Sequence, residues 1–190
     1  QAVLACREEF GDRLAIGFGV EICYRRTWEE RIRDFLRGKE FDYVLGSVHH
    51  LEGRDFVTDE QYFAGKTQRQ AYEEYFAEVL RLAESGLCHG LAHLDVIERR
   101  GAKIYGSYDA SEYADSLAPI FAAAVRRGLA VEINLSGYRQ GLGKPTPGLD
   151  VLDLYGRAGG RLVTIGSDAH RAFRACPEHA EVWEHVEKND

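Results

Sequence analysis

The sequence predicts an α/β protein built on a mostly parallel sheet. Five segments are continuous apolar, β-branched or aromatic runs without polar alternation, which is typical of strands covered on both faces. Segments with helical spacing lie between them, and this alternation favours right-handed βαβ units and parallel pairing. The pattern alone leaves open whether the sheet is open or closed into a barrel.

The strands and helices can be assigned in order along the chain. The opening residues, as far as Gly11, are expected to be the end of an amphipathic helix. The predicted strands cover residues 14–24, 41–50, 86–97, 128–137 and 161–170. The predicted helices cover residues 27–38, 67–86, 110–127 and 149–158. The longest irregular stretch, about residues 51–66, follows a strand and is predicted to be an active-site loop.

Start and break signals refine the helices. Thr27 with Glu30, and Thr67 with Gln70, both have the spacing of a capping box. Pro119 is expected to kink the third helix or divide it in two.

The composition is that of an ordinary globular domain. The chain has 190 residues, 45% of them apolar and 29% charged, so we expect residues 1–190 to form one domain. Its net charge of -7 disfavours long nucleic acid as a partner. No apolar run approaches the roughly 20 residues that span a bilayer, and no secretory leader opens the chain, so no membrane partner is expected.

The cysteines give a prediction about the cellular compartment. They are widely scattered, without the C-x-x-C spacing of a zinc or redox motif, and we interpret them as reduced thiols of a cytoplasmic protein. They are Cys6, Cys23, Cys88 and Cys176.

Ionisable side chains stand at the carboxyl ends of the predicted strands, which meet at one mouth in a parallel barrel. Histidines and carboxylates that converge from separate strands suit zinc, manganese or iron. A single histidine at a strand end is more often a hydrogen-bonded core residue. The D-x-H pair is stronger, because alternate side chains point to the same side. The candidate ligands are Glu21, His49, His93, Asp168 and His170.

Three further polar residues have competing interpretations. Asp95 either orients a ligand histidine or caps the following turn. Ser136 either hydrogen-bonds a phosphate or simply belongs to a turn. His89 is predicted to be a buried core histidine, because it shares a strand face with His93.

Five segments together resemble a known family. They are "GFGVEICY", "FDYVLGSVHH", "GLAHLDVIERRG", "VEINLSGYRQG" and "TIGSDAH". In this order and spacing they resemble the histidinol-phosphatase branch of the polymerase and histidinol phosphatase (PHP) superfamily. The resemblance implies a distorted, parallel-stranded (β/α)7 TIM-like barrel. We expect this chain to supply only part of that barrel, because the family's H-x-H segment is not found upstream of Glu21 and the chain stops soon after "GSDAH".

The resemblance also implies a site. Two or three zinc, manganese or iron ions would be held by the five candidate ligands, and Arg99 and Arg139 would bind the substrate phosphate, for which a guanidinium is well shaped. The implied activity is hydrolysis of L-histidinol phosphate to L-histidinol and phosphate, a step of histidine biosynthesis, by attack of a metal-bound hydroxide. Residues implied to act directly on this small substrate are His93, Asp168 and His170, with Ser136 as a further contact.

Other functions stay open at this stage. One is a metal-dependent hydrolase of another substrate, such as a nucleotide phosphoesterase, an exonuclease or an amidohydrolase, although Arg99 and Arg139 favour a phosphate over an amide. Another is a noncatalytic remnant of the fold, which the missing H-x-H segment supports. The oligomeric state is not predicted.

Overall fold

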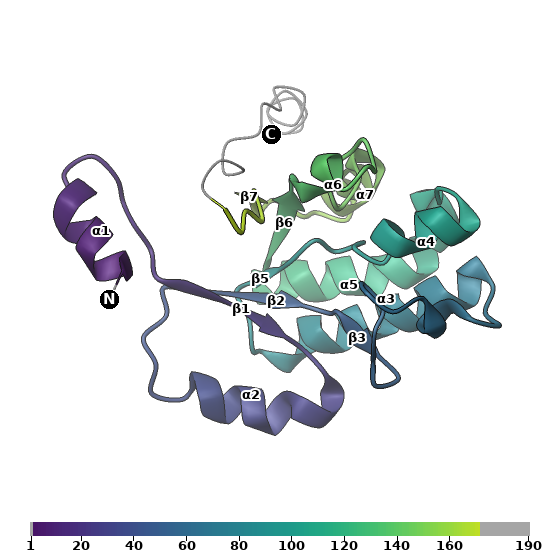
Figure 1. Ribbon diagram of the computed structural model, residues 1–190, viewed down its shortest axis with the longest axis horizontal. Coiled ribbons are helices and arrows are strands. Elements are labelled where there is room, and N and C mark those ends of the chain that lie inside the picture. Colours follow the sequence, from purple (N-terminus) through teal and green to yellow (C-terminus); the bar gives the residue numbers. More distant parts are fainter. Residues whose placement is uncertain (1, 172–190) are drawn as a thin grey trace.

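A parallel five-stranded sheet forms the centre of the molecule in the computed structural model, which describes residues 2–171 (Figure 1). The strands are β1 (Gly19–Cys23), β2 (Tyr43–Ser47), β5 (Gly90–Leu91), β6 (Ala130–Asn134) and β7 (Val163–Gly166). They lie in this order across the sheet, and each neighbouring pair is parallel. All five fall inside the predicted ranges, so the α/β class is confirmed.

The helices lie between the strands in the chain. They are α1 (Ala2–Phe10), α2 (Glu29–Leu36), α3 (Gln68–Ser85), α4 (Glu98–Tyr105), α5 (Ala114–Arg127), α6 (Ser136–Arg139) and α7 (Leu149–Arg157). Short 3-10 helices are η1 (Arg26–Trp28), η2 (Glu60–Phe63) and η3 (Ala110–Tyr113). The predicted loop at residues 51–66 contains η2 and most of a hairpin of β3 (His50–Leu51) and β4 (Arg54–Asp55).

Helix α3 supplies much of the core. Its first turn has the predicted capping box, in which Thr67 and Gln70 satisfy each other's backbone N–H groups. Tyr72, Tyr75 and Phe76 are completely buried. Helix α5 packs beside α3, and α7 packs against α5 (Figure 1). Helices α3 and α5 therefore form a layer against one face of the sheet, behind β2 and β5 in this view.

Thr27 does not act as predicted, and of the two effects predicted for Pro119 the division of the helix is wrong. Thr27 does not cap α2, because the chain enters that helix through η1 and the Arg26 N–H donates instead to the distant Glu78 carboxylate, at 3.1 Å. Pro119 does not divide its helix, since α5 runs from residue 114 to residue 127 without interruption. The break lies earlier, where η3 gives way to α5.

His89 is also placed differently from the prediction. It is exposed, and its Nδ1 accepts a hydrogen bond from the Val44 backbone N–H at 2.9 Å. Strand β5 comprises only Gly90 and Leu91, so His89 precedes it at the amino end of the sheet. Alternation along a strand therefore does not apply between His89 and His93.

Helix α1 stands apart from the rest of the molecule (Figure 1). It buries no residue, and Leu4 is exposed. Arg7 links it to the body by an ion pair with Asp42 and a hydrogen bond to the Ile16 carbonyl. The predicted opening helix is thus present as far as Phe10, but it contributes nothing to the core.

The helices and the cysteines can be compared with the expectations about membranes and thiols. Within residues 2–171 no helix combines the length and the apolar character needed to cross a bilayer. Cys6, Cys23 and Cys88 are free thiols, as predicted, whereas Cys176 lies outside the described residues.

Gly46 gives a test of how β2 packs under α3. A Cβ there would lie 2.9 Å from Leu82 Cδ1 and 3.0 Å from the Cys88 Sγ. We expect Gly46→Ala to lower the free energy of unfolding by about 1–3 kcal/mol through overpacking, measured by urea denaturation. Gly156→Ala is the control, because it meets nothing within 4 Å and should be neutral or stabilise α7. Equal stability of the two variants would contradict this packing.

Candidate metal centre

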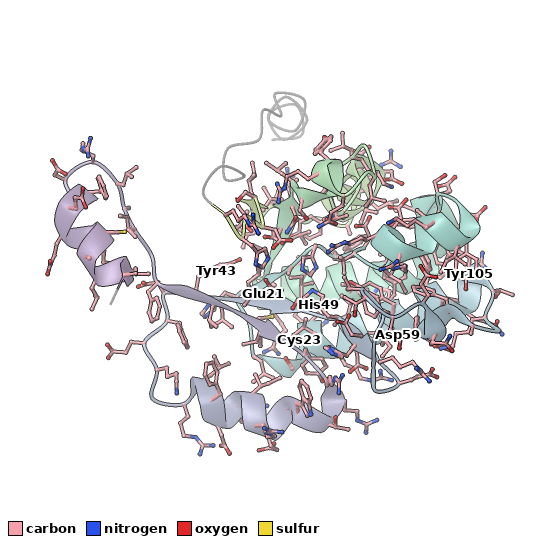
Figure 2. All side chains as sticks on the ribbon, viewed as in Figure 1. Glu21, Cys23, Tyr43, His49, Asp59 and Tyr105 are labelled. Carbon is pink, nitrogen blue, oxygen red and sulfur yellow. The ribbon has the colours of Figure 1, made fainter. Side chains whose placement is uncertain are left out.

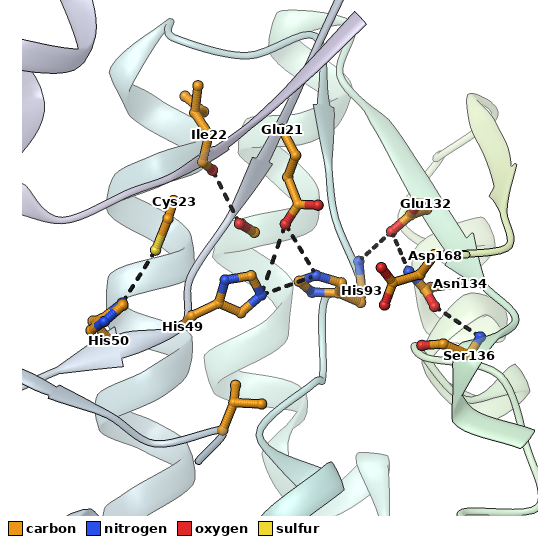
Figure 3. Close-up of polar contacts among 12 residues, drawn as sticks. Glu21, Ile22, Cys23, His49, His50, His93, Glu132, Asn134, Ser136 and Asp168 are labelled. Atoms are coloured by element: carbon orange, nitrogen blue, oxygen red, sulfur yellow. Dashed lines mark hydrogen bonds and ion pairs between the residues drawn. The ribbon is translucent and has the colours of Figure 1, made fainter. Parts of the chain in front are cut away.

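Three of the predicted ligands meet at the carboxyl ends of adjacent strands (Figures 2 and 3). Glu21 belongs to β1, His49 follows the end of β2 by two residues, and His93 follows the end of β5 by two residues. His49 Nε2 lies 3.8 Å from Glu21 Oε1, His93 Nε2 lies 3.5 Å from the same oxygen, and the two Nε2 atoms are 3.2 Å apart.

This geometry fits a small divalent cation. Ligand bonds of about 2.0–2.2 Å in a tetrahedral zinc site place neighbouring donor atoms roughly 3.3–3.6 Å apart. The three donor atoms all lie within 4.8 Å of one another, and their separations bracket that value. Two imidazoles and one carboxylate are also the donor types that zinc, manganese and iron accept. The residues present therefore fit the metal that the sequence implied.

The charges of the cluster are strongly coupled. Burial raises the pKa of Glu21, but the hydrogen bond and charge of His93 outweigh it and bring that pKa down to about 2. Burial, together with the charge of His93, lowers the pKa of His49 to about 4. At neutral pH the cluster thus offers an ionised carboxylate and a neutral His49 ring, both of which can donate electron pairs to a cation.

His93 behaves in the opposite way. Burial lowers its pKa, but the hydrogen bond that its ring donates to Glu21 and the negative charges of Glu132, Glu21 and Asp168 raise it above the ordinary value. The site therefore draws positive charge to the position of His93, whether a proton or a cation carries it.

Backbone strain occurs at two predicted ligands. His93 has φ +26 and Asp168 has φ +49, in the left-handed region that residues other than glycine rarely adopt. Such strain persists only where the surrounding structure enforces it, and it is common at functional sites. Its presence at both positions indicates that these side chains are held in place.

Asp168 and His170 lie at the edge of this cluster and do not join it within ligand distance. Asp168 comes after β7 and lies near His93 and Glu132 (Figure 3). His170 Nε2 is 3.1 Å from Asp168 Oδ1, but the His170 side chain is 88% exposed. The pair is thus on the predicted rim, with only its carboxylate turned towards the centre.

The predicted phosphate contacts are less closely grouped. Arg139 ends α6 and donates hydrogen bonds to the carbonyls of Ser167 and Asp168, which places its charge beside the D-x-H pair. Ser136 is buried at the start of α6, where its hydroxyl accepts a hydrogen bond from Gln140. Arg99 is half-buried in the first turn of α4, and its side chain makes no hydrogen bond among residues 2–171.

The Asp95 side chain is bonded neither to His93 nor to the turn that follows it. Its Oδ2 accepts hydrogen bonds from Tyr108 Oη at 2.9 Å and from the Gly148 N–H at 3.0 Å. Burial and the neighbouring Glu98 raise its pKa to about 7. Asp95 thus connects the segment after β5 to the start of α7, a role that differs from both interpretations of the sequence.

Two polar pairs near the centre were missed by sequence reasoning. On β6, Glu132 and Asn134 alternate with apolar neighbours and turn their side chains towards the segment that carries His93 (Figure 3). At the other side, Cys23 Sγ and His50 Nδ1 are 3.3 Å apart. The signal for Glu132 was a carboxylate in the middle of the apolar run "AVEINL".

Comparison with known proteins identifies the family. The family model of the PHP domain matches residues 2–136. The chain belongs to the PHP domain family. The predicted resemblance to its histidinol-phosphatase branch is confirmed by curated relatives. A probable histidinol-phosphatase of Clostridium acetobutylicum is 33% identical over 80% of this chain and 59% of the relative. One of Deinococcus radiodurans is 31% identical over 89% of this chain and 63% of the relative.

A solved structure shows the fold of this PHP domain. The histidinol phosphate phosphatase of Lactococcus lactis, complexed with zinc, L-histidinol and phosphate, superposes with a TM-score of 0.80 at 24% identity. The match covers all of this chain and 72% of that chain. It confirms the expected TIM-like α/β fold, of which the described residues form a part with five parallel strands. The chain spans about three fifths of the length of the two curated relatives described above.

The coupled charges predict how the two imidazoles titrate. In metal-free protein, ¹H–¹⁵N NMR should show His93 titrating above 6.5 and His49 near pH 4. Added Zn²⁺ should abolish the His93 titration and shift protonation of His49 to lower pH, because the cation competes with the proton for both rings. Two independent titrations near 6.5, unchanged by zinc, would contradict the cluster geometry.

The same shifts have opposite effects on stability. Unfolded His49 binds a proton between pH 6.5 and 4 and folded His49 does not, so acidification through this window destabilises the metal-free fold. The contribution of His93 is fully present below 6.5 and is lost as the pH rises through its folded pKa. His49→Gln should remove the acid-side loss, which denaturation at pH 7 and pH 4.5 can measure.

Proposed function

We propose that this chain belongs to a phosphomonoesterase that uses divalent metal ions to hydrolyse L-histidinol phosphate to L-histidinol and phosphate. The observation that carries the proposal is the Glu21, His49 and His93 cluster at the mouth of a PHP domain. The names of the relatives support the reaction, and the zinc, L-histidinol and phosphate in the L. lactis structure support the metal and the substrate class.

The proposed centre holds two or three ions of zinc, manganese or iron. Bound there, such ions would act as Lewis acids that stabilise negative charge on a phosphoryl group and ease ionisation of water. Glu21 and the neutral ring of His49 would hold one of them together with His93. We assign Asp168 and His170 as further ligands, because Asp168 lies close enough to raise the pKa of His93.

The proposed substrate contacts come from α4 and α6. Arg139 lies beside Asp168, so its guanidinium adds positive charge at the edge of the cluster where a phosphate would bind. Arg99 and Ser136 complete the proposed set. His93, Asp168 and His170 are the residues proposed to act at the reacting phosphorus. The proposal treats residues 1–190 as one domain, which the continuous core among residues 22–155 supports. It also assigns that domain to a cytoplasmic enzyme.

The proposal is tested by phosphate release from L-histidinol phosphate. The chain is stripped with a chelator, reloaded with Zn²⁺, Mn²⁺ or Fe²⁺, and assayed beside a nucleoside monophosphate. We expect activity only with metal and a preference for L-histidinol phosphate. His49→Gln should lower turnover at least about 100-fold, since even residues outside the ligand set cost 10–100-fold.

His89→Gln is the matched control for that variant. It removes an exposed imidazole at the opposite end of the sheet and should keep metal content and turnover. Metal binding without release of phosphate from any ester would overturn the proposed reaction. A preference for the nucleotide would overturn the proposed substrate.

Arg139 gives a separate test of phosphate binding. Arg139→Ala should raise KM about tenfold or more, because it removes a charged contact made in both ground and transition states. A fall in kcat should accompany it, since Arg139 also holds the carbonyl of Asp168. Arg139→Lys should have KM and kcat values between those of the unmodified chain and those of Arg139→Ala. Arg126→Ala removes an exposed charge on α5 and should change neither KM nor kcat. An unchanged KM in Arg139→Ala would exclude it from the phosphate site.

A further inference from the structure

A buried carboxylate in the middle of β6 contacts the backbone of His93. Glu132 is 6% exposed, and its Oε2 accepts a hydrogen bond from the His93 N–H at 3.0 Å (Figure 3). We infer that Glu132 is a positioning residue, which holds the backbone of His93 so that its imidazole faces Glu21 and His49. The inference rests on the metal centre proposed above and assigns a residue that is not among its ligands.

The backbone of His93 needs such a partner. Its φ of +26 is unfavourable for a residue with a Cβ and requires compensation from tertiary contacts. The Glu132 carboxylate gives the buried His93 amide an acceptor, and a buried donor without a partner would be costly. The same Oε2 also accepts from Asn134 Nδ2 at 3.1 Å, so a single oxygen joins β6 to the segment after β5.

No hydrogen bond from Nδ1 of His93 fixes the orientation of its ring within the described residues. A metal-binding histidine is usually aligned by a hydrogen bond from its second ring nitrogen. Here Nε2 faces Glu21 and His49, and Nδ1 is buried without a hydrogen-bond partner among residues 2–171. The orientation of His93 therefore depends on the hydrogen bond from its backbone N–H to Glu132, and not on a hydrogen bond from Nδ1.

The neighbours of Glu132 keep its carboxylate in place. A Cβ at Gly166 on β7 would lie 2.1 Å from Glu132 Oε1, so the glycine leaves the space that the carboxylate occupies. Asn134 is in turn held by the Ser136 N–H, which donates to its Oδ1 at 2.9 Å. Strands β6 and β7 thus enclose a carboxylate whose function is exerted on the segment that follows β5.

The experiment compares Glu132→Gln with Glu132→Leu in the 190-residue chain. Glutamine keeps an oxygen that can accept from His93, whereas leucine has a similar size and no acceptor. Zn²⁺ affinity is measured by competition with a chelator, and the Co²⁺ absorption spectrum reports ligand geometry. We expect Glu132→Gln to stay within about threefold of the unmodified chain, and Glu132→Leu to bind Zn²⁺ about 10–100-fold more weakly with an altered Co²⁺ spectrum.

Glu78→Leu is a matched control. Glu78 is likewise a buried carboxylate that accepts a backbone N–H, that of Arg26, but it does not contact His93. The Glu78→Leu variant should be less stable than the unmodified chain and should bind Zn²⁺ with the same affinity. Gly166→Ala is a second test that removes no polar group, because it displaces the Glu132 carboxylate directly, and it should weaken Zn²⁺ binding as Glu132→Leu does.

Amide hydrogen exchange separates this inference from the metal proposal. In metal-free protein the His93 amide should exchange at least about tenfold faster in Glu132→Leu, as expected when one hydrogen bond is lost, and at the unmodified rate in Glu132→Gln. If the unmodified chain binds no Zn²⁺, the metal centre is wrong and the exchange rates alone decide the role of Glu132.

Two results would overturn the inference. Glu132→Gln binding Zn²⁺ as weakly as Glu132→Leu would mean that Glu132 acts through its charge or as a ligand. Unchanged Zn²⁺ affinity and unchanged His93 exchange in Glu132→Leu would mean that it does not position His93. If Glu132→Leu does not fold, Gly166→Ala decides by the same two measurements.

Discussion

Parallel pairing of β1, β2 and β5 is the constraint on which the rest of the site depends. Parallel strands end at the same edge of a sheet, so Glu21, His49 and His93 meet although the chain between them includes α2 and α3. Helix α3 packs against β2 with a largely buried face, whereas α2 buries only Ile32. The donor atoms are therefore positioned by the core and do not depend on a flexible loop.

Electrostatics adds a second constraint to this geometry. Two imidazoles whose Nε2 atoms lie 3.2 Å apart cannot both hold a proton at neutral pH, and Glu21 attracts positive charge to the space between them. A cation in that space removes the conflict, because both rings then act as neutral donors. A bound cation would explain this arrangement. Without one, burying three ionisable side chains this close together would lower the stability of the fold.

The sequence predicted the parts of the fold that depend on local pattern. Apolar runs located all five strands, because a strand covered on both faces needs no other signal. The capping box of α3 was found because all of its groups lie within four residues. Thr27 does not cap α2, and the nearby Arg26 N–H donates to Glu78, which is 52 residues from Arg26. The tertiary partner of a helix end cannot be read from the four residues around it.

The site was predictable to the same extent. The convergence of Glu21, His49 and His93 was predictable, because strand ends converge in any parallel sheet. Glu132 was not, because its contact with His93 joins residues 39 apart and depends on the register between β5 and β6. Nor could the sequence tell that Asp95 turns towards Gly148, since the path of the chain after α6 decides which amide it meets.

Helix α1 should tolerate changes of sequence, because it lies apart from the core. Its side chains take no part in the interior, and a solvent-facing guanidinium–carboxylate pair of this kind adds little to folding. Most substitutions along its exposed length should consequently be silent. A label attached to an exposed side chain of this helix would lie away from the candidate metal centre.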